Sequence, residues 1–144
     1  MSDINYVDGW PQPYPQLDAV PYWAALQERR LTYQHCSACN QAVWPAHSRC
    51  PHCGADSSCL AWRESSGRGT VYSFSTVMRG PTPAWAAIAP YTVGFIEMEE
   101  GYHLFSQING QPQDMRIGKP VSVRFVARGD QMLPVFDMTD CKPE

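Results

Sequence analysis

Four of the six cysteines in the 144-residue chain form two pairs with the same internal spacing. Two residues separate Cys36 from Cys39 and Cys50 from Cys53, and ten residues lie between the pairs. A two-residue gap lets one tight turn direct two thiolates at the same ion, and four sulfur ligands suit a tetrahedral structural zinc site. Four thiolates leave no position open for water, which argues against zinc catalysis. Iron would fit the same sulfur tetrahedron, and we take zinc as the expected metal.

The remaining cysteines and the nearby histidines offer no comparable site. Cys59 and Cys141 have no partner at ligand spacing, so we interpret them as free thiols. His35 and His52 lie beside the cysteine pairs. Because four thiolates already complete the metal site, we expect both histidines to be exposed or to lie next to the ligands rather than to bind the ion.

Catalytic motifs are missing from the chain. It has no nucleophile elbow, zinc-protease, phosphate-loop or dinucleotide motif. His103, Glu97 and Asp137 could meet in three dimensions as a general acid or base, but their spacing gives no reason to expect it. We therefore name no catalytic residue.

Composition places the chain among ordinary globular domains. Hydrophobic residues make up 44% of it and charged residues 17%, and the net charge is −3. No apolar run approaches the roughly 20 residues that span a bilayer. The first 18 residues have neither the apolar nor the basic region of a signal peptide. We expect a cytoplasmic protein with reduced cysteines and no membrane association.

Residues 1–34 are predicted to form an arm followed by a docking helix. Pro11, Pro13 and Pro15 exclude a helix in the first part, which is either a loose tail or an extended arm laid on a neighbouring surface. Residues 21–30 place Tyr22 and Leu26 on one helical stripe, with two arginines expected in the last turn. A strand over residues 31–35 then leads into the first cysteine pair.

The chain beyond the cysteines has the pattern of an all-β domain. Alternating residues and turn signals predict five strands, over residues 69–78, 91–98, 102–108, 121–126 and 132–138. Five strands without an intervening helix favour a small, partly open OB-fold barrel. The predicted fold is mainly β: a docking helix, a small zinc ribbon at residues 35–60 and a five-stranded OB-fold at 61–144. The aromatic residues of these strands are spaced as core residues, namely Tyr72, Phe74, Phe95, Phe105 and Phe125.

A long apolar connection over residues 80–90 follows the first barrel strand. Trp85 lies near its middle and Arg79 directly precedes it. Such a loop either packs on its own barrel or contacts a partner or ligand, since exposed apolar patches mark such sites. We regard Arg79 and Trp85 as candidate contacts of an acyl-CoA or a partner.

Charge weighs against nucleic acid as the ligand of the barrel. From residue 60 onward there are eight lysines and arginines against nine aspartates and glutamates. Because phosphate neutralisation dominates nucleic-acid affinity, a barrel with this balance is not expected to bind single strands, although a local basic patch stays open.

The chain resembles a family of acyl-CoA-associated proteins, formerly a domain of unknown function, that join a rubredoxin-like zinc ribbon to an OB-fold. The resemblance covers nearly all of residues 21–137. It rests on the helix PYWAALQERRL, the two cysteine pairs with Pro45 and Arg49 between them, and the stretches GRGTVYSFSTV, YTVGFIEMEEG and RIGKPVSVRF. Similar sequences often carry a histidine where this chain has Met78.

The resemblance implies a non-catalytic subunit in a hetero-oligomer of lipid metabolism. Its partner would be a thiolase-like enzyme, such as an aldolase lyase that cleaves a β-hydroxyacyl-CoA in steroid degradation, or an acyltransferase. The chain would help to form a shared acyl-CoA site. Two other functions stay open: a stand-alone single-stranded nucleic-acid-binding module, and a self-sufficient enzyme.

Overall fold

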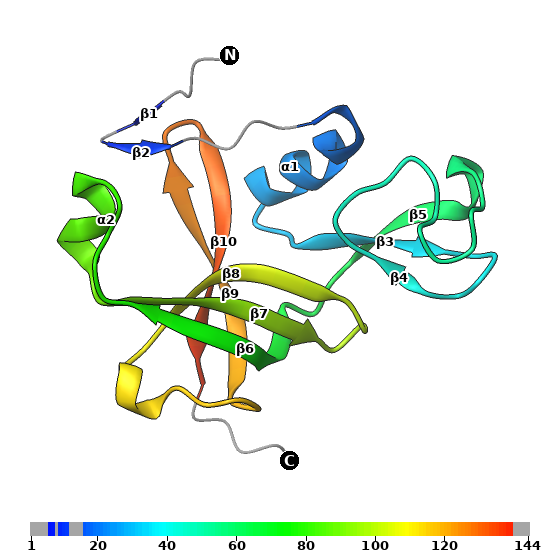
Figure 1. Ribbon diagram of the computed structural model, residues 1–144. Helices are drawn as coiled ribbons and strands as arrows, with labels where there is room; N and C mark the ends of the chain where they lie inside the picture. Colours follow the sequence, from blue (N-terminus) through cyan, green and yellow to red (C-terminus); the bar gives the residue numbers. More distant parts are fainter. Residues whose placement is uncertain (1–5, 8, 12–15, 140–144) are drawn as a thin grey trace.

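Figure 1 presents the computed structural model of the chain, which describes residues 6–7, 9–11 and 16–139. A short arm and a helix lead into a small three-stranded sheet, and a barrel follows. The helices are α1 (Val20–Gln27) and α2 (Pro83–Ile88), with short 3-10 turns at Leu17–Ala19, Ser57–Cys59 and Pro112–Asp114. The strands are β1 (Tyr6–Val7), β2 (Trp10–Pro11), β3 (Thr32–Cys36), β4 (Ala42–Val43), β5 (Leu60–Glu64), β6 (Arg68–Val77), β7 (Tyr91–Met98), β8 (His103–Asn109), β9 (Pro120–Arg128) and β10 (Gln131–Met138).

The five predicted barrel strands are present, and they close on themselves. Their order is β10-β8-β7-β6-β9, and β9 pairs with β10 to close the ring. Every pair is antiparallel except β8 with β10, which run parallel. This parallel pairing makes the barrel closed rather than partly open, and the strand order is that of an OB-fold.

Aliphatic side chains from successive strands make up most of the barrel interior, together with Phe136. Val71, Ile96 and Leu104 are cross-strand neighbours and all are buried. Gly94 lies where β6 passes very close to β7, because a Cβ there would come 2.2 Å from the carbonyl oxygen of Ser73. A side chain at this position would force the two strands apart.

The prediction that the barrel aromatics belong to the core is wrong for four of the five residues. Tyr72, Phe74, Phe95 and Phe105 are all exposed, with Tyr72 and Phe105 each 54% exposed. Alternation identifies two faces of a strand but not which of them points inward. The inward positions of β6, β7 and β8 are held mainly by aliphatic residues, and a register shift between Val71 and Ser73 adds an extra residue to β6.

The zinc ribbon contains a three-stranded sheet in the order β4-β3-β5. Strand β5 was not predicted; it pairs with the whole of β3, from Thr32 opposite Glu64 to Cys36 opposite Leu60. The chain therefore returns along β3, the central strand of this sheet, before it enters the barrel (Figure 1).

Helix α1 ends earlier than the sequence predicted. The amide of Arg29 donates to the carbonyl of Leu26 and that of Arg30 to the carbonyl of Ala25, and Arg29 has a left-handed φ of 58°. These two bonds form a Schellman motif, which terminates a helix. Arg29 and Arg30 therefore lie beyond the last turn, not within it.

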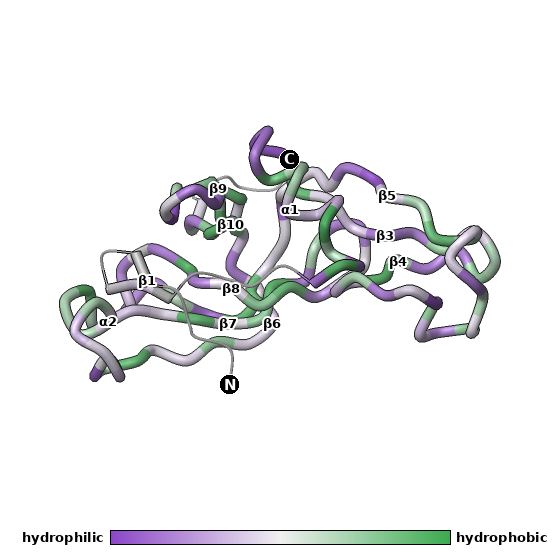
Figure 2. Tube along the Cα trace, turned by 90° about the horizontal axis from the view of Figure 1, so that it is seen from above, coloured by the Kyte–Doolittle hydropathy of each residue, from purple (hydrophilic) through white to green (hydrophobic). Residues whose placement is uncertain are grey.

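One core joins the helix, the ribbon and the barrel. Leu26 and Tyr22 of α1 are buried in the same cluster as Leu31 and Tyr33 from the start of the ribbon sheet. Tyr33 stacks on Tyr102 of the β7–β8 hairpin with ring centroids 5.0 Å apart. Figure 2 shows the ribbon extending from one side of the barrel, with α1 between them.

We predict that Leu26→Ala destabilises the whole molecule. Leu26 is completely buried at the junction of helix, ribbon and barrel, and truncating such a side chain costs about 2–5 kcal/mol. Denaturant unfolding of the zinc-loaded protein measures the change in unfolding free energy. Val20→Ala on the same helix is the control, because Val20 is 51% exposed. Equal effects of the two substitutions would contradict the shared core.

Candidate functional site

The four predicted ligands meet at one point of the ribbon. The sulfur atoms of Cys36, Cys39, Cys50 and Cys53 all lie within 4.8 Å of one another. Cys36 Sγ is 3.7 Å from Cys53 Sγ, and Cys39 Sγ is 3.6 Å from Cys50 Sγ. Both distances far exceed a disulfide bond of about 2.05 Å. They match the edge of a sulfur tetrahedron around zinc with Zn–S bonds of about 2.3 Å, so the residues fit structural zinc.

Two equivalent turns build this tetrahedron. In the first, Cys36 N donates to the carbonyl of Gln41 and Asn40 N to that of Cys36. In the second, Cys50 N donates to Ala55 and Gly54 N to Cys50 in the same pattern. Asn40 and Gly54 occupy matching positions and have left-handed φ values of 60° and 79°. Asparagine and glycine tolerate this conformation best, so Asn40 was a signal that sequence reasoning missed.

The electrostatics of the cluster call for a cation. Burial alone would raise the pKa of Cys50, but the backbone N–H groups of Cys53 and His52 favour its thiolate and lower the pKa to about 6. His52 N lies 3.4 Å from Cys50 Sγ. Burial raises the pKa of Cys39 to about 12, with a further contribution from Cys50. Neighbouring thiols therefore resist joint ionisation, and a divalent cation removes that obstacle.

The histidines near the ribbon have structural contacts. A ring nitrogen of His52 lies 3.1 Å from the carbonyl oxygen of Ala42, so His52 is next to the ligands as expected. His35 is half-buried on β3. A contact that the sequence did not suggest is made by Gln34, whose side-chain amide both accepts from the backbone N–H of His47 (2.8 Å) and donates to its carbonyl (3.1 Å). These two hydrogen bonds fasten the loop between the cysteine pairs to β3.

Cys59 lies next to the metal site but is not one of its ligands. Cys59 is half-buried and packs against the small core formed by Cys36, Val43 and Cys50. It is a free thiol, as predicted. Cys141 lies outside the described residues.

The three residues considered as a general acid or base are not all brought together. Glu97 and His103 are cross-strand neighbours at the hairpin end of β7 and β8. The ring of His103 stacks on Tyr72 at 4.5 Å. Asp137 instead lies opposite Asn109, at the other end of β8. Six residues of extended strand separate these ends, roughly 20 Å.

An aromatic surface occupies the outside of the barrel over β6, β7 and β8. It consists of Tyr72, Phe95, Phe105 and the ring of His103, and we call it the outer aromatic wall. Phe95 and Phe105 are directly opposite each other with ring centroids 5.2 Å apart. An exposed cluster of this kind usually marks a contact surface.

The segment predicted as an apolar loop contains helix α2, and Trp85 lies on it. The ring of Trp85 packs edge-on against Trp10 of the arm, with centroids 4.5 Å apart, and in a tilted arrangement against Tyr91 at 4.7 Å. The guanidinium of Arg128 lies 4.4 Å from the centre of the Trp10 ring. At least this part of the arm therefore lies on the barrel domain, as the extended-arm interpretation expected.

Trp85 also lines a groove of about 310 Å³ between α1, α2 and β10. Aromatic side chains dominate it, and Arg128 contributes a charged group. Arg79 does not line this groove; it is exposed at the bend after β6. The structure thus places the two candidate contact residues in different surroundings. The remaining side chains of the groove include Trp23, Trp44, Phe105, Gln107, Leu133 and Val135.

None of the helices in the described part of the chain combines the length and the apolar character needed to cross a membrane.

We predict that Cys39→Ser releases the metal and unfolds the ribbon. A serine hydroxyl is a poor substitute for a thiolate ligand, and the small ribbon core depends on the metal. Zinc content per chain and limited proteolysis within residues 36–59 measure the two effects. Cys59→Ser is the control, since it changes a nearby cysteine outside the tetrahedron. A Cys39→Ser protein with one zinc per chain and normal protease resistance would disprove the assignment.

Two family models match the chain in the order of its structural parts. The rubredoxin-like zinc ribbon domain of ChsH2 matches residues 23–58. The C-terminal OB-fold domain of ChsH2 matches residues 62–126. The boundary between them falls next to β5, the strand that leads from ribbon to barrel.

Individual proteins agree with these models. The chain is 34% identical to a "DUF35 domain-containing scaffold protein" of Methanothermobacter thermautotrophicus, over 75% of this chain and 81% of that protein. It is also 34% identical to a "Probable enoyl-CoA hydratase alpha subunit" of Thermomonospora curvata, over 88% of this chain but only 39% of the length of that subunit.

A solved structure matches the chain almost from end to end. It is a chain of the "Ltp2-ChsH2(DUF35) aldolase", with a TM-score of 0.77 and 32% identity, and the match covers 88% of this chain and 98% of that chain. Together with the four-cysteine ribbon and the closed five-stranded barrel, these similarities show that the chain belongs to the DUF35 family of ChsH2-like proteins, which join a rubredoxin-like zinc ribbon to an OB-fold.

Proposed function

We propose that the protein is a non-catalytic accessory subunit of an acyl-CoA-metabolising complex. Its partner is a thiolase-like enzyme: an aldolase that cleaves a β-hydroxyacyl-CoA, as in a steroid side chain, or an acyltransferase. The observation that carries the proposal is the similarity, over 98% of the related chain, to the DUF35 component of an aldolase. Catalytic residues lie on the partner, and this chain helps to form the acyl-CoA site.

The outer aromatic wall is the proposed surface for the partner. Phe95 is 46% exposed and stands in the middle strand of the three. Arg68, which shares strand β6 with Tyr72, is already paired with Glu99. An aromatic surface whose neighbouring cation is paired suits an apolar protein surface better than a phosphate backbone.

The groove beside Trp85 is the proposed contact with the acyl-CoA. Its aromatic walls suit an apolar acyl group, and Arg128 provides a positive charge at its edge. Trp85 and Arg79 remain our proposed contact residues, Trp85 for the ligand and Arg79 for the partner, since Arg79 lies outside the groove. We also propose that residues 1–34, 35–60 and 61–144 act as arm and docking helix, ribbon and OB-fold, and that the complex works in the cytoplasm.

The proposal predicts that the isolated chain does not turn over acyl-CoA. With a thiolase-like subunit from the same genome it should co-purify, and the pair should cleave β-hydroxyacyl-CoA or transfer an acyl group. Size-exclusion chromatography of the co-expressed proteins and assays with and without the partner measure both outcomes. Turnover by the chain alone would support a self-sufficient enzyme, and recovery with bare nucleic acid would support the alternative of a nucleic-acid-binding module.

A charge introduced into the outer aromatic wall sharpens this test. Phe95→Glu should abolish co-purification without loss of zinc, because it buries a carboxylate in an apolar interface. Ile117→Glu is the matched control, since Ile117 is 71% exposed and lies outside this wall. Normal assembly of Phe95→Glu would place the partner on another surface.

A further prediction separates the two roles of Trp85. If Trp85 contacts the ligand, Trp85→Ala should weaken acyl-CoA binding by the complex by about 2 kcal/mol or more, with little change in melting temperature. Trp10→Ala is the control, because Trp10 packs on Trp85 but does not line the groove. A Trp85→Ala protein that melts earlier yet binds normally would reduce Trp85 to a packing residue of its own chain.

A further inference from the structure

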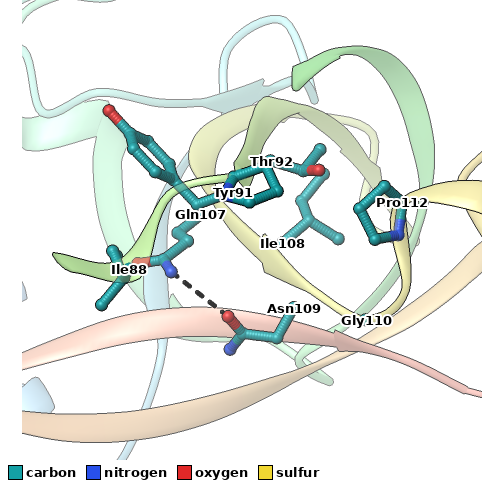
Figure 3. Close-up of a pocket in the computed structure, with 9 residues that line it drawn as sticks. Ile88, Tyr91, Thr92, Gln107, Ile108, Asn109, Gly110 and Pro112 are labelled. Carbon is teal, nitrogen blue, oxygen red and sulfur yellow. Dashed lines mark hydrogen bonds between the residues drawn. The ribbon is translucent and has the colours of Figure 1, made fainter. Parts of the chain in front are cut away.

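A second, smaller pocket lies at the end of the barrel where β7 begins and β8 ends (Figure 3). Its volume is about 270 Å³, slightly below the roughly 300–1,000 Å³ of sites that enclose a drug-sized molecule. Ile88, Pro90, Ile108 and Pro112 form aliphatic walls, while Gln107 and Asn109 contribute amides. No carboxylate, ammonium, guanidinium or imidazole lines it. The pocket thus suits a neutral segment of a larger ligand.

A chain of hydrogen bonds fixes the orientation of both amides. Arg124 donates to Asp137 at 2.8 Å and holds the pKa of that carboxyl below its usual value, with help from Asn109. An ionised carboxylate only accepts hydrogen bonds, so Asn109 must turn its NH₂ group toward it, at 3.1 Å. The carbonyl of Asn109 then faces the other way and accepts from Nε2 of Gln107 at 3.3 Å.

This series of hydrogen bonds ends at Gln107, which lines both this pocket and the groove beside Trp85 and has a free hydrogen-bonding edge. The bond to Asn109 is the one side-chain hydrogen bond that Gln107 makes among the described residues. Its Oε1 acceptor and second Nε2 hydrogen are therefore available, and Figure 3 shows the side chain next to Ile88 in the pocket lining. A preorganised amide of known orientation loses little entropy when it binds a partner.

The chemistry of this pocket excludes an anion and favours an amide. Arg124 already satisfies Asp137 and does not line the pocket, so no cation is offered to a phosphate or carboxylate. Gln107 presents one acceptor and one donor between aliphatic walls, which complements an uncharged group with an N–H and a carbonyl on an aliphatic chain. We infer that the pocket binds a secondary amide of such a chain, and specifically the pantetheine arm of the acyl-CoA. The identity of the arm rests on the proposed function.

The test uses the full-length, zinc-loaded chain and D-pantetheine as the probe. In ¹⁵N-edited NMR spectra, the side-chain NH₂ signals of Gln107 and Asn109 should shift in a saturable manner. Gln107→Met, which keeps the length of the side chain but removes both polar groups, should weaken binding about tenfold. Gln41→Met, an exposed glutamine of the ribbon, should bind like the wild type.

Three outcomes would overturn the inference. They are no shift up to the solubility limit of pantetheine, equal affinity of Gln107→Met and wild type, or a shift with adenosine instead of pantetheine, which would assign the pocket to a heterocyclic base. Co-purification of Gln107→Met with the thiolase-like subunit keeps the two proposals apart. If the variant assembles but has lost pantetheine binding, both hold; if it fails to assemble, the pocket belongs to the subunit interface and not to a ligand.

Discussion

The metal tetrahedron is the constraint on which the rest of the molecule depends. The ribbon core contains only three fully buried side chains, and two of them are ligands. So little apolar burial cannot offset the entropy of ordering this segment, and the metal supplies the difference. Because Cys36 ends β3, the metal also fixes the strand that carries Tyr33 into the barrel core. Trp44 lies between the cysteine pairs, and its ring packs edge-on against Tyr22 of α1. A local coordination site thereby positions the helix and one side of the barrel.

The barrel buries most of its aliphatic residues and exposes several of its aromatic ones. Aliphatic side chains make up most of its interior, with the ring of Phe136 among them. Four aromatic rings of β6, β7 and β8 lie instead on the outside, and others line the groove between α1 and α2. Placing these large rings in water costs free energy that a monomer does not recover. Under the proposed function, assembly with the partner subunit would cover these rings.

Much of this structure could be predicted from the sequence, and the failures have physical causes. Cysteine spacing identified the metal site because two-residue gaps determine the local turn, and alternation with turn signals located all five barrel strands. The burial of Tyr72 and Phe105 was predicted wrongly, since period-two patterns do not distinguish inside from outside. Strand β5 was missed because its partner, β3, is distant in sequence. The pocket at Gln107 was invisible because three separate strands contribute to its hydrogen-bond chain.

The parallel pairing of β8 with β10 affects the order in which the parts of the protein fold during translation. Phe136 of β10 is completely buried, and it cannot enter the barrel until the segment that carries β10 has left the ribosome. Helix α1 likewise cannot complete its contacts until late in translation, since the side chain of Gln27 donates a hydrogen bond to the carbonyl of Asp130, 103 residues later. The ribbon closes over a short loop and can form early, whereas the barrel interior stays open to water during translation. The nascent chain therefore passes through a state with a finished ribbon and an unsealed barrel, which is the stage at which chaperones or a waiting partner subunit would encounter it.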